Sequence, residues 1–378
     1  MRQRFTLREI APPIQAPNSL LGKDVWLLNL DQIEPHTGKL LSRTSVESSA
    51  VGASTHAFDA GNLLYSKLRP YLNKVYLPDG VGFCTSELVP LRPNPNLVTR
   101  EYLAAYLRSP KFLAWVDQQV DGAKMPRVSM KIFWDYEIDL PSLDEQKRII
   151  AIVQMADRLR RKRQEVIRLA DDFMRAVFVE MFGDPVSNTK HLPTEVIERL
   201  CPVATGATPS RERTDYFGGA HPWVKTGEVD SPWITKAEEH ISDLAIKETN
   251  CKIFPARTVL IAMYGQGKTR GKAGMLGMPA ATNQACAAIL PSTSIDPFFL
   301  HAQLSLMYDH LRAMGRGGNQ ENLNLGMIKS LPVLVPPPVL VKSFLAIRQR
   351  TELLIEKARL AESESARLAR SLGSTFLA

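Results

Sequence analysis

The chain repeats itself, and this repeat constrains its fold more than any other feature of the sequence. Glu137-Ile-Asp-Leu-Pro141 and Pro332-Val-Leu-Val-Pro336 lie 195 positions apart, and each is typical of a short strand that ends in proline before a helix. Upstream, Leu63-Leu-Tyr65 resembles Val259-Leu-Ile261 at an offset of 196 positions. The sequence therefore predicts two copies of one unit, each a mixed α/β domain followed by a long helix.

Each of these prolines is followed by an apolar pattern with a period of seven residues, which is typical of helices that bury a narrow seam against a partner helix. The first seam is predicted at Ile149, Ile152, Ala156, Leu159, Arg163, Val166, Ala170, Phe173 and Val177, and the second at Phe344, Ile347, Thr351, Leu354, Ala358, Ala361, Ser365, Leu368 and Leu372. Each seam could instead pack onto its own domain. The register shared by both copies favours pairing of the two helices with each other.

The repeat also predicts the domain boundaries. We expect a first globular domain at residues 1–141, a long helix with its hinge at 142–185, a second globular domain at 186–336 and a C-terminal helix at 337–378. Gly183 and Pro185 predict the end of the first helix, because glycine is favoured just after a helix and proline cannot continue one. At 1.5 Å per residue the first helix would be about 60 Å long and could act as a spacer.

Charge and cysteine usage narrow the class of protein. A formal net charge of +8 and a pI near 9.3 favour a polyanionic partner, although charge alone is weak support for nucleic-acid binding. Cys84, Cys201, Cys251 and Cys286 form no CxxC pair, so they predict buried thiols and neither a zinc site nor a disulfide framework. The sequence has no run of 18 apolar residues, so we expect a cytoplasmic protein outside the membrane.

Motifs for catalysis are incomplete in this sequence. Ala262-Met-Tyr-Gly-Gln-Gly-Lys-Thr269 ends like a phosphate-binding P-loop, but alanine replaces the first glycine and no helical pattern follows. Neither HExxH, GxSxG nor the loop with which amino-methyltransferases hold a flipped base is found, and the seven histidines have no metal-ligand spacing. The sequence therefore predicts no catalytic residues and no metal ligands.

Basic residues among glycines and aromatics in loops are the remaining candidates. Residues 252–318 contain seven lysines and arginines against two aspartates, a local charge of +5. Arg and Lys bind phosphates and guanine edges, whereas Asn and Gln bind adenine edges. The predicted DNA-binding residues are Lys67, Arg69, Lys74, Lys124 and Arg127 in the first copy, and Lys268, Thr269, Arg270, Lys272, Arg316, Asn319 and Gln320 in the second. Alternatively, the loop aromatics belong to the core and the cations only keep the loops soluble.

Several segments in order resemble motifs of the specificity subunits of Type I restriction-modification systems, and the resemblance covers nearly the whole chain. In the second copy they are Gly206-Ala-Thr-Pro-Ser210, Pro222-Trp-Val-Lys-Thr-Gly-Glu228, Met263-Tyr-Gly-Gln-Gly-Lys-Thr-Arg-Gly271 and Thr282-Asn-Gln284. In the first copy they are Trp26-Leu-Leu-Asn-Leu-Asp31, Lys67-Leu-Arg-Pro-Tyr-Leu72 and Pro141-Ser-Leu-Asp-Glu-Gln146, with Met181-Phe-Gly-Asp-Pro185 after the helix. The second copy departs from the proline-Glu-Gln pattern with Pro336-Pro-Pro-Val-Leu-Val341.

This resemblance implies a non-catalytic subunit with two target-recognition domains, related by a pseudo-twofold repeat and held apart by two long antiparallel coiled-coil helices. It implies recognition of a bipartite target in double-stranded DNA for phage defence, with two methyltransferase (modification) subunits and restriction/translocase subunits as partners. S-adenosylmethionine and ATP would be used by those partners, and no cofactor would be bound by this chain. Two alternatives remain: the recognition half of a self-contained restriction-methylation enzyme, and a coiled-coil adaptor without DNA contact. The absence of a methylase segment argues against the first, and specific DNA binding would exclude the second.

Overall fold

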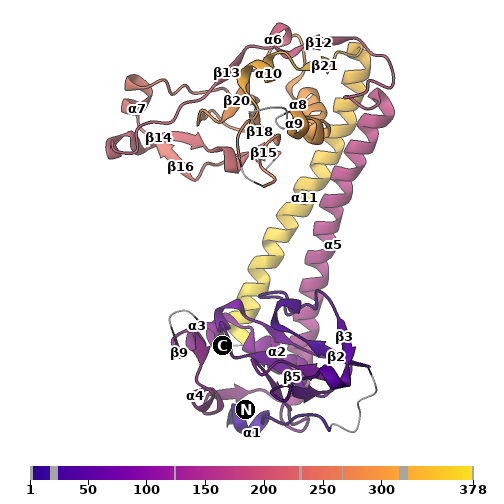
Figure 1. Ribbon diagram of the computed structural model, residues 1–378, viewed down its shortest axis with the longest axis vertical. Helices are drawn as coiled ribbons and strands as arrows, with labels where there is room; N and C mark the ends of the chain where they lie inside the picture. The colour runs from indigo at the N-terminus through magenta and orange to yellow at the C-terminus, as the bar shows by residue number, and fades with distance from the viewer. Residues whose placement is uncertain are drawn as a thin grey trace. The chain divides into compact units, whose positions relative to one another are not determined.

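The computed structural model describes residues 3–17, 24–122, 125–229, 232–265, 267–314 and 322–376, with the backbone alone for residues 121 and 362–376. The chain is mixed α/β (Figure 1). Its contacts divide it into two compact units: unit 1 contains Met1–Gln164 and Arg359–Ala378, and unit 2 contains Glu165–Ala358. Both long helices are divided between the units, and the four domain boundaries expected above stay a prediction.

Unit 1 is built on two small sheets. One has the strand order β3 (Thr44–Glu47), β2 (Asp24–Leu28), β7 (Gly82–Cys84) and β4 (His56–Phe58), and the other has the order β6 (Val75–Tyr76), β5 (Leu63–Ser66) and β8 (Leu88–Leu91). The short helices are α2 (Arg100–Leu107), α3 (Pro110–Asp117) and α4 (Met130–Trp134). Tyr65 of β5 packs against Phe112 of α3 and Phe133 of α4, with ring centroids 6.1 and 4.6 Å away. This aromatic packing joins the second sheet to its helices.

Unit 2 contains a five-stranded and a three-stranded sheet. Their orders are β13 (Val203–Thr205), β20 (Cys286–Ile289), β17 (Val259–Ala262), β18 (Ala273–Leu276), β15 (Trp233–Ile234), and β16 (Glu239–Ile241), β14 (Phe217–Val224), β19 (Ala281–Thr282). The short helices are α6 (Ile197–Leu200), α7 (Asp243–Glu248), α8 (Pro297–Leu306), α9 (Tyr308–Met314) and α10 (Leu325–Lys329). Asp296 caps α8 by accepting hydrogen bonds from the N–H groups of Phe298 and Phe299.

Each unit leads into a long helix through a pair of antiparallel strands. In unit 1, β1 (Gln3–Thr6) pairs with β11 (Glu137–Leu140), and α5 (Leu143–Phe182) follows. In unit 2, β12 (Thr194–Val196) pairs with β21 (Pro332–Leu334), and α11 (Pro338–Phe376) follows. The predicted sequence of strand, proline and long helix is confirmed at both places.

The predicted end of the first helix is also confirmed. Helix α5 ends at Phe182, and Gly183 adopts a φ of +78°, a left-handed conformation that glycine accepts without steric cost. The N–H of Gly183 donates to the carbonyl of Val179 at 2.8 Å. The Asp184 carboxylate then accepts from the N–H groups of Val186 and Ser187 and closes the turn.

The two helices are anchored to their domains by different chemistry. Gln146 in the first turn of α5 is fully buried; its side-chain oxygen accepts from the Thr99 N–H at 2.8 Å and its amide donates to the Leu97 carbonyl at 2.9 Å. The equivalent position in α11 is Val341, a half-buried apolar residue, and Phe344 one turn later is buried in the core of unit 2. The ring of Phe344 lies 6.1 Å from that of Phe299 in α8. The departure from the proline-Glu-Gln pattern thus coincides with an apolar anchor.

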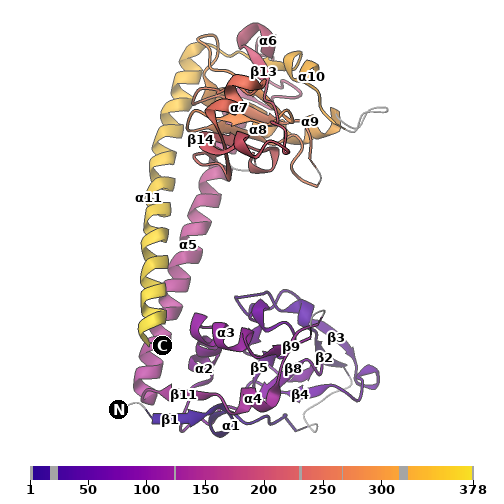
Figure 2. The same cartoon turned by 90° about the vertical axis from the view of Figure 1, so that its left-hand side faces the viewer.

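Phenylalanines also join α5 to α11 within unit 2. Phe178 and Phe182 of α5 each place a ring 5.7 Å from Phe344, and both contact Phe299 at 5.4 and 5.0 Å. The last turns of α5 therefore lie beside the first turns of α11 in this unit (Figure 1 and Figure 2). In unit 1, the Arg163 guanidinium of α5 donates to the Ala361 carbonyl of α11.

The seam of each helix differs from the predicted one. Ile149 and Phe344 are buried and Ile152 and Ile347 half-buried, but Leu159, Val166 and Phe173 of α5 are 39%, 46% and 51% exposed, and Leu354 of α11 is 61% exposed. The side chain of Leu368 lies outside the described residues. The shielded positions in unit 2 are instead Ile167, Ala170, Met174, Val177, Phe178, Met181 and Phe182 of α5, and Val341, Phe344, Arg348, Thr351, Ile355 and Ala358 of α11.

The difference between the predicted and the observed seam has a simple geometric cause. Positions 163, 170, 177 and 351 keep their places, but a shielded residue follows each of them after four positions, and the residue after three positions is exposed. Steps of three-then-four and four-then-three have the same seven-residue period, so periodicity alone does not separate them. A shift of one residue turns a side chain by about 100° around the helix, which moves Phe173 and Leu354 out of the seam.

The four cysteines are unpaired and buried, as expected from their spacing. Among the helices of the described residues, none is long and apolar enough to cross a membrane.

The corrected seam predicts opposite outcomes for two neighbouring residues. Ile355→Asp should lower the free energy of unfolding by about 2–4 kcal/mol, because Ile355 is 6% exposed and the new carboxylate would be buried without a partner. Leu354→Asp, the matched control, should change it by less than about 0.5 kcal/mol because its side chain lies in solvent. Urea unfolding of both variants measures the difference. Equal destabilisation would contradict the corrected register.

Candidate nucleic-acid interface

The first predicted basic loop, in unit 1, follows strand β5 and has a well-defined backbone. The Lys67 N–H donates to the Glu87 carbonyl at 3.0 Å, and the Lys67 carbonyl accepts from the Val128 N–H at 3.0 Å. Arg69 has a φ of +47°, and its N–H donates to the Pro126 carbonyl at 2.8 Å. A left-handed conformation at a non-glycine residue is strained and persists where its surroundings hold it. The fold therefore fixes the path of the loop on which Lys67 and Arg69 lie.

Lys74 and Arg127 are bound to other groups of unit 1. The Lys74 ammonium donates to the Leu30 carbonyl at 2.5 Å, and burial lowers the pKa of this lysine. Arg127 forms a two-pronged ion pair with Glu87, with a closest N–O distance of 2.7 Å. The hydrogen bond from Arg127 is the largest cause of the lowered pKa of Glu87. Both residues stay predicted DNA contacts, but each would have to give up or share these bonds.

His56 lies near Lys67 and was not among the predicted residues. Its Nδ1 lies 2.9 Å from the Gln15 side-chain nitrogen, and burial, followed by the charge of Lys67, lowers its pKa. The Gln15 oxygen accepts from the Ala57 N–H at 3.2 Å. With the amide nitrogen donating to Nδ1, the neutral imidazole carries its proton on Nε2 and offers a hydrogen-bond donor there. Gln15 and His56 are 41 positions apart, so no local pattern could indicate this pair.

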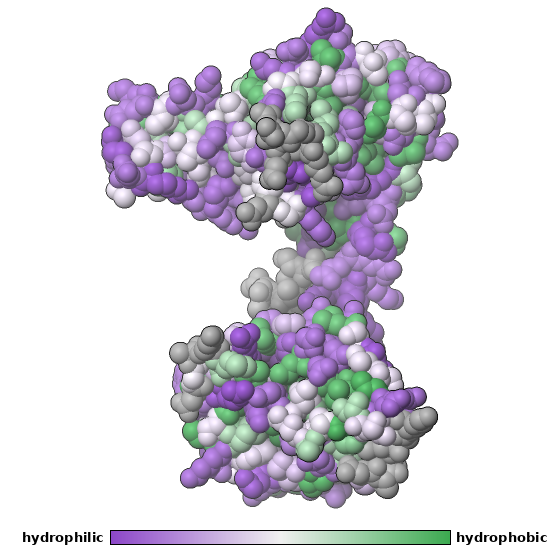
Figure 3. All heavy atoms as spheres, viewed as in Figure 1, coloured by the Kyte–Doolittle hydropathy of each residue, from purple (hydrophilic) through white to green (hydrophobic). Residues whose placement is uncertain are grey.

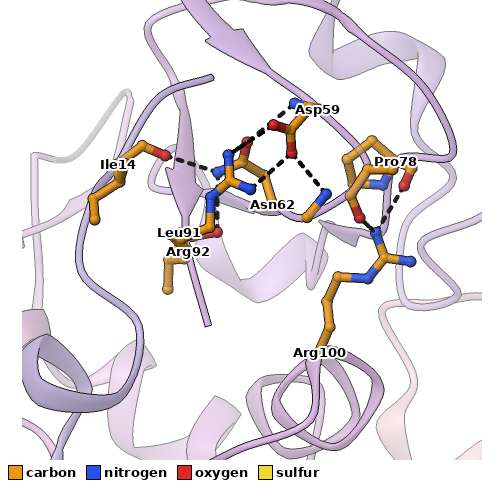
Figure 4. Close-up of polar contacts among 9 residues, drawn as sticks. Ile14, Asp59, Asn62, Pro78, Leu91, Arg92 and Arg100 are labelled. Atoms are coloured by element: carbon orange, nitrogen blue, oxygen red, sulfur yellow. Dashed lines mark hydrogen bonds and ion pairs between the residues drawn. The ribbon is translucent and has the colours of Figure 1, made fainter. Parts of the chain in front are cut away.

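Two arginines of unit 1 hold its framework together (Figure 4). Arg92 pairs with Asp59 at 2.9 Å and donates to the Asn62 side-chain oxygen at 3.1 Å, while the Asn62 amide donates to the Ile14 carbonyl at 2.8 Å. Arg100 donates to the carbonyls of Ala60 and Pro78. These cations cross-link strands and loops of the domain.

The second predicted basic loop, in unit 2, follows strand β17 and is shaped by glycines. Gly265, Gly267 and Gly271 have φ values of +143°, +64° and +85°. A side chain on Gly265 would meet Thr269 at 2.8 Å, so this loop needs glycine for space as well as conformation. Strand β18 follows the loop, which confirms that the helix expected after a P-loop is missing.

A tyrosine holds the tip of this loop. The Tyr308 hydroxyl of α9 donates to the Lys268 carbonyl at 2.7 Å and accepts from the Arg312 guanidinium at 2.7 Å. The Lys268 side chain is exposed, whereas Thr269, Arg270 and Lys272 are half-buried. Of the predicted loop residues, Lys268 is therefore the cation most accessible to a polyanion. Lys124, Arg316, Asn319 and Gln320 lie outside the described residues.

Three cations of the lobe around β14, β16 and α7, Arg211, Arg213 and Lys225, are paired with carboxylates. Arg211 bonds Glu239 at 2.6 Å, and Lys225 lies 2.8 Å from Glu238 and 3.0 Å from Glu239. These bonds lower the pKa of Glu239 and raise that of Lys225. The visible surface of this lobe is mostly hydrophilic (Figure 3). Its paired charges make it a weaker attractor of DNA than the loop that carries Lys268.

Known proteins resemble this chain in sequence. Residues 44–169 and 196–339, more than half of the chain, match the family described as Type I restriction modification DNA specificity domain. The EcoDI specificity subunit of a Type I restriction enzyme from Escherichia coli is 22% identical over 178 residues, which cover 46% of this chain and 38% of that protein. The MjaIX specificity subunit from Methanocaldococcus jannaschii is 26% identical over 150 residues, covering 38% and 33%. This chain thus spans 33% to 38% of these relatives' length.

Solved structures resemble it in fold. A chain from a study of complex assembly and conformational transition in the type I R-M system aligns over 100% of this chain and 97% of its own, with a TM-score of 0.59 and 18% identity. The Type-I restriction-modification S subunit from M. genitalium aligns over 99% and 95%, with a TM-score of 0.59 and 12% identity. At these identities the two structures show a common fold.

The Asp59–Arg92 pair predicts a pH-dependent contribution to stability. Burial raises the pKa of Asp59, but bonds from Arg92 and from the Gly61 N–H outweigh it and hold the pKa below its usual value. Such a carboxylate stabilises the fold above its unfolded pKa of about 4, and the contribution is lost as the pH falls through the lower folded pKa. Asp59→Asn should therefore cost about 1–2 kcal/mol at pH 7 and progressively less below about pH 4.

Unfolding followed by circular dichroism between pH 7 and pH 3 measures this effect. The control is Asp79→Asn, since the Asp79 carboxylate is exposed and lies 3.9 Å from Arg43. A loss for Asp59→Asn that stayed constant over the whole pH range would rule out the ion pair as its cause.

Proposed function

Since this chain belongs to the Type I restriction modification DNA specificity family, we propose that it reads a bipartite sequence in double-stranded DNA, one half-site with each unit. The observation that carries this proposal is the similar loop frame of both units. In unit 1, the backbone N–H of Lys67 donates to the Glu87 carbonyl, and the Lys67 carbonyl accepts from the Val128 N–H. In unit 2, the backbone N–H of Met263 donates to the Ala285 carbonyl, and the Met263 carbonyl accepts from the Leu323 N–H. In each unit the basic loop leaves this frame after a central strand.

Further pairing supports two copies of one unit. Strand β2 pairs in parallel with β7, where Trp26 is opposite Gly82, and β14 pairs in parallel with β19, where Trp223 is opposite Ala281. Central strands β5 and β17 pair antiparallel with β8 and β20. We interpret these similarities as a pseudo-twofold repeat, whose long helices form an antiparallel coiled coil and set the spacing of the half-sites.

Partner subunits are proposed to carry out the chemistry. Two modification subunits would methylate the target with S-adenosylmethionine, and restriction/translocase subunits would use ATP, while this non-catalytic chain binds neither cofactor. The long helices offer apolar side chains to such partners. In unit 2, Val166, Leu169 and Phe173 of α5 and Leu353 and Leu354 of α11 are exposed. Exposed apolar groups at successive helical turns are typical of surfaces that bind another protein.

The main test of the proposed function assigns one loop to one half-site. Lys268→Ala with Arg270→Ala should weaken recognition of one half-site, and Lys67→Ala with Arg69→Ala should weaken recognition of the other. Each lost base contact should cost about 1–3 kcal/mol and relax the sequence preference, whereas lost phosphate contacts weaken all sequences alike.

Single-molecule sequencing of methylated adenines, in cells that contain the complete system, gives the recognised sequence for each double variant. Lys268→Ala alone is the milder arm, because the Lys268 side chain is exposed whereas that of Arg270 is half-buried. A variant that changes both half-sites together, or neither, would show the assignment of loops to half-sites to be wrong.

A second test addresses the partner surface. Phe173→Asp should leave the melting temperature of the isolated chain within about 2 °C, because this exposed residue contributes little to the fold. It should weaken assembly with the modification subunits at least tenfold, because a charge would enter an apolar interface. Size-exclusion chromatography and calorimetric titration measure both effects, with Arg175→Asp in the same helix as the control. Unchanged assembly would remove Phe173 from the interface.

A further inference from the structure

Unit 2 contains an open polar pocket of about 390 Å³ away from the glycine loop. It lies where the end of β13 meets the segment before β17 and the turn before β20. Its lining residues are Thr205, Gly206, Ala207, Thr208, Asn250, Lys252 and Gln284. The lining contains one cation and no carboxylate, unlike the ion-paired surface around β14.

Gly206 allows the two walls of the pocket to touch. A Cβ atom at this position would lie 2.0 Å from the Thr282 carbonyl oxygen, so any side chain would force the segments apart. The Ala207 N–H donates to the same carbonyl at 2.9 Å, and the Thr205 hydroxyl donates to the Gln284 carbonyl at 3.0 Å. This close approach holds Thr208 next to Gln284.

Thr208 decides which part of Gln284 is available to a ligand. Its hydroxyl donates to the Gln284 side-chain oxygen, which takes up one of the two lone pairs of that oxygen and leaves both N–H groups of the amide for a ligand. The Lys252 ammonium, on an exposed side chain, can only donate. The pocket thus offers hydrogen-bond donors and one positive charge, which suits an anionic group rich in acceptors.

We propose that this pocket binds a phosphodiester group of the DNA backbone, an inference that rests on the proposed function. Phosphate and sugar groups receive half to two-thirds of the hydrogen bonds in protein–DNA complexes. Recognition of adenine by glutamine uses both its oxygen and its nitrogen, and the Gln284 oxygen would have to share its bond with Thr208, whereas a phosphate oxygen needs only the amide N–H groups. The contact therefore adds affinity and positions the DNA without selecting a base.

The test compares two lysines of unit 2 in the complete complex with its modification subunits. Lys252→Ala removes the charge of the pocket, and Lys247→Ala removes an exposed charge of α7 that does not line it. Binding is measured on a duplex with the methylation-mapped target and on an unrelated duplex, from about 50 to 200 mM salt. Lys252→Ala should weaken both duplexes by a similar factor of about three to ten and reduce the salt slope by about one relative to Lys247→Ala.

Gln284→Ala provides a second, uncharged arm. It should weaken both duplexes with the salt slope unchanged, because it removes a donor and no charge. Methylation mapping should give the wild-type sequence for both variants. A changed base preference would show that the pocket contacts bases and not a phosphate group. Binding equal to that of Lys247→Ala would show that the pocket does not contact DNA. If the wild-type complex itself shows no sequence preference, the proposed function fails instead.

Discussion

Burial of four phenylalanine rings in unit 2 fixes where the second long helix starts, and the position of its other side chains depends on that anchor. Phe178 and Phe182 of α5, Phe299 of α8 and Phe344 of α11 have ring centroids 5.0 to 6.1 Å apart. Contacts of this kind contribute roughly 0.5–1.5 kcal/mol per pair beyond the area that they bury. Once Phe344 is held, Thr351 one heptad later and Ile355 one turn after Thr351 must face the same side.

A hydrogen-bonding residue anchors the first helix in unit 1. Gln146 bonds the Thr99 N–H and the Leu97 carbonyl, so the first turn of α5 is tied to the segment that opens α2. A buried amide that lost either partner would cost about 1–3 kcal/mol, which makes its position more specific than that of an apolar side chain. The same succession of strand, proline and long helix is therefore anchored by different residues in the two units.

Some basic side chains of this protein bond groups of their own domain, and others are exposed to solvent. Arg92, Arg100 and Arg127 bond groups of their own domain, and Arg211 and Lys225 are paired with carboxylates. Lys268 is exposed on the glycine loop that Tyr308 holds. Lys252 is exposed at the edge of a polar pocket whose lining contains no carboxylate. A net charge of +8 therefore does not tell which cations are available to DNA or where they lie.

The sequence by itself determined the succession of elements, because strands, helix stops and heptads leave local signatures: the proline-ended strands, Gly183 and two helices of about 40 residues were predictable from spacing alone. It also placed a basic loop after the central strand of each unit. Tertiary structure decided which side of each long helix is buried. Leu354 and Ile355 are neighbours, and either one fits a seven-residue period, but only Ile355 is buried. It also decided which cations are engaged and which polar groups meet, because Glu87 with Arg127 and Thr208 with Gln284 are brought together across 40 and 76 positions by packing that no local pattern encodes.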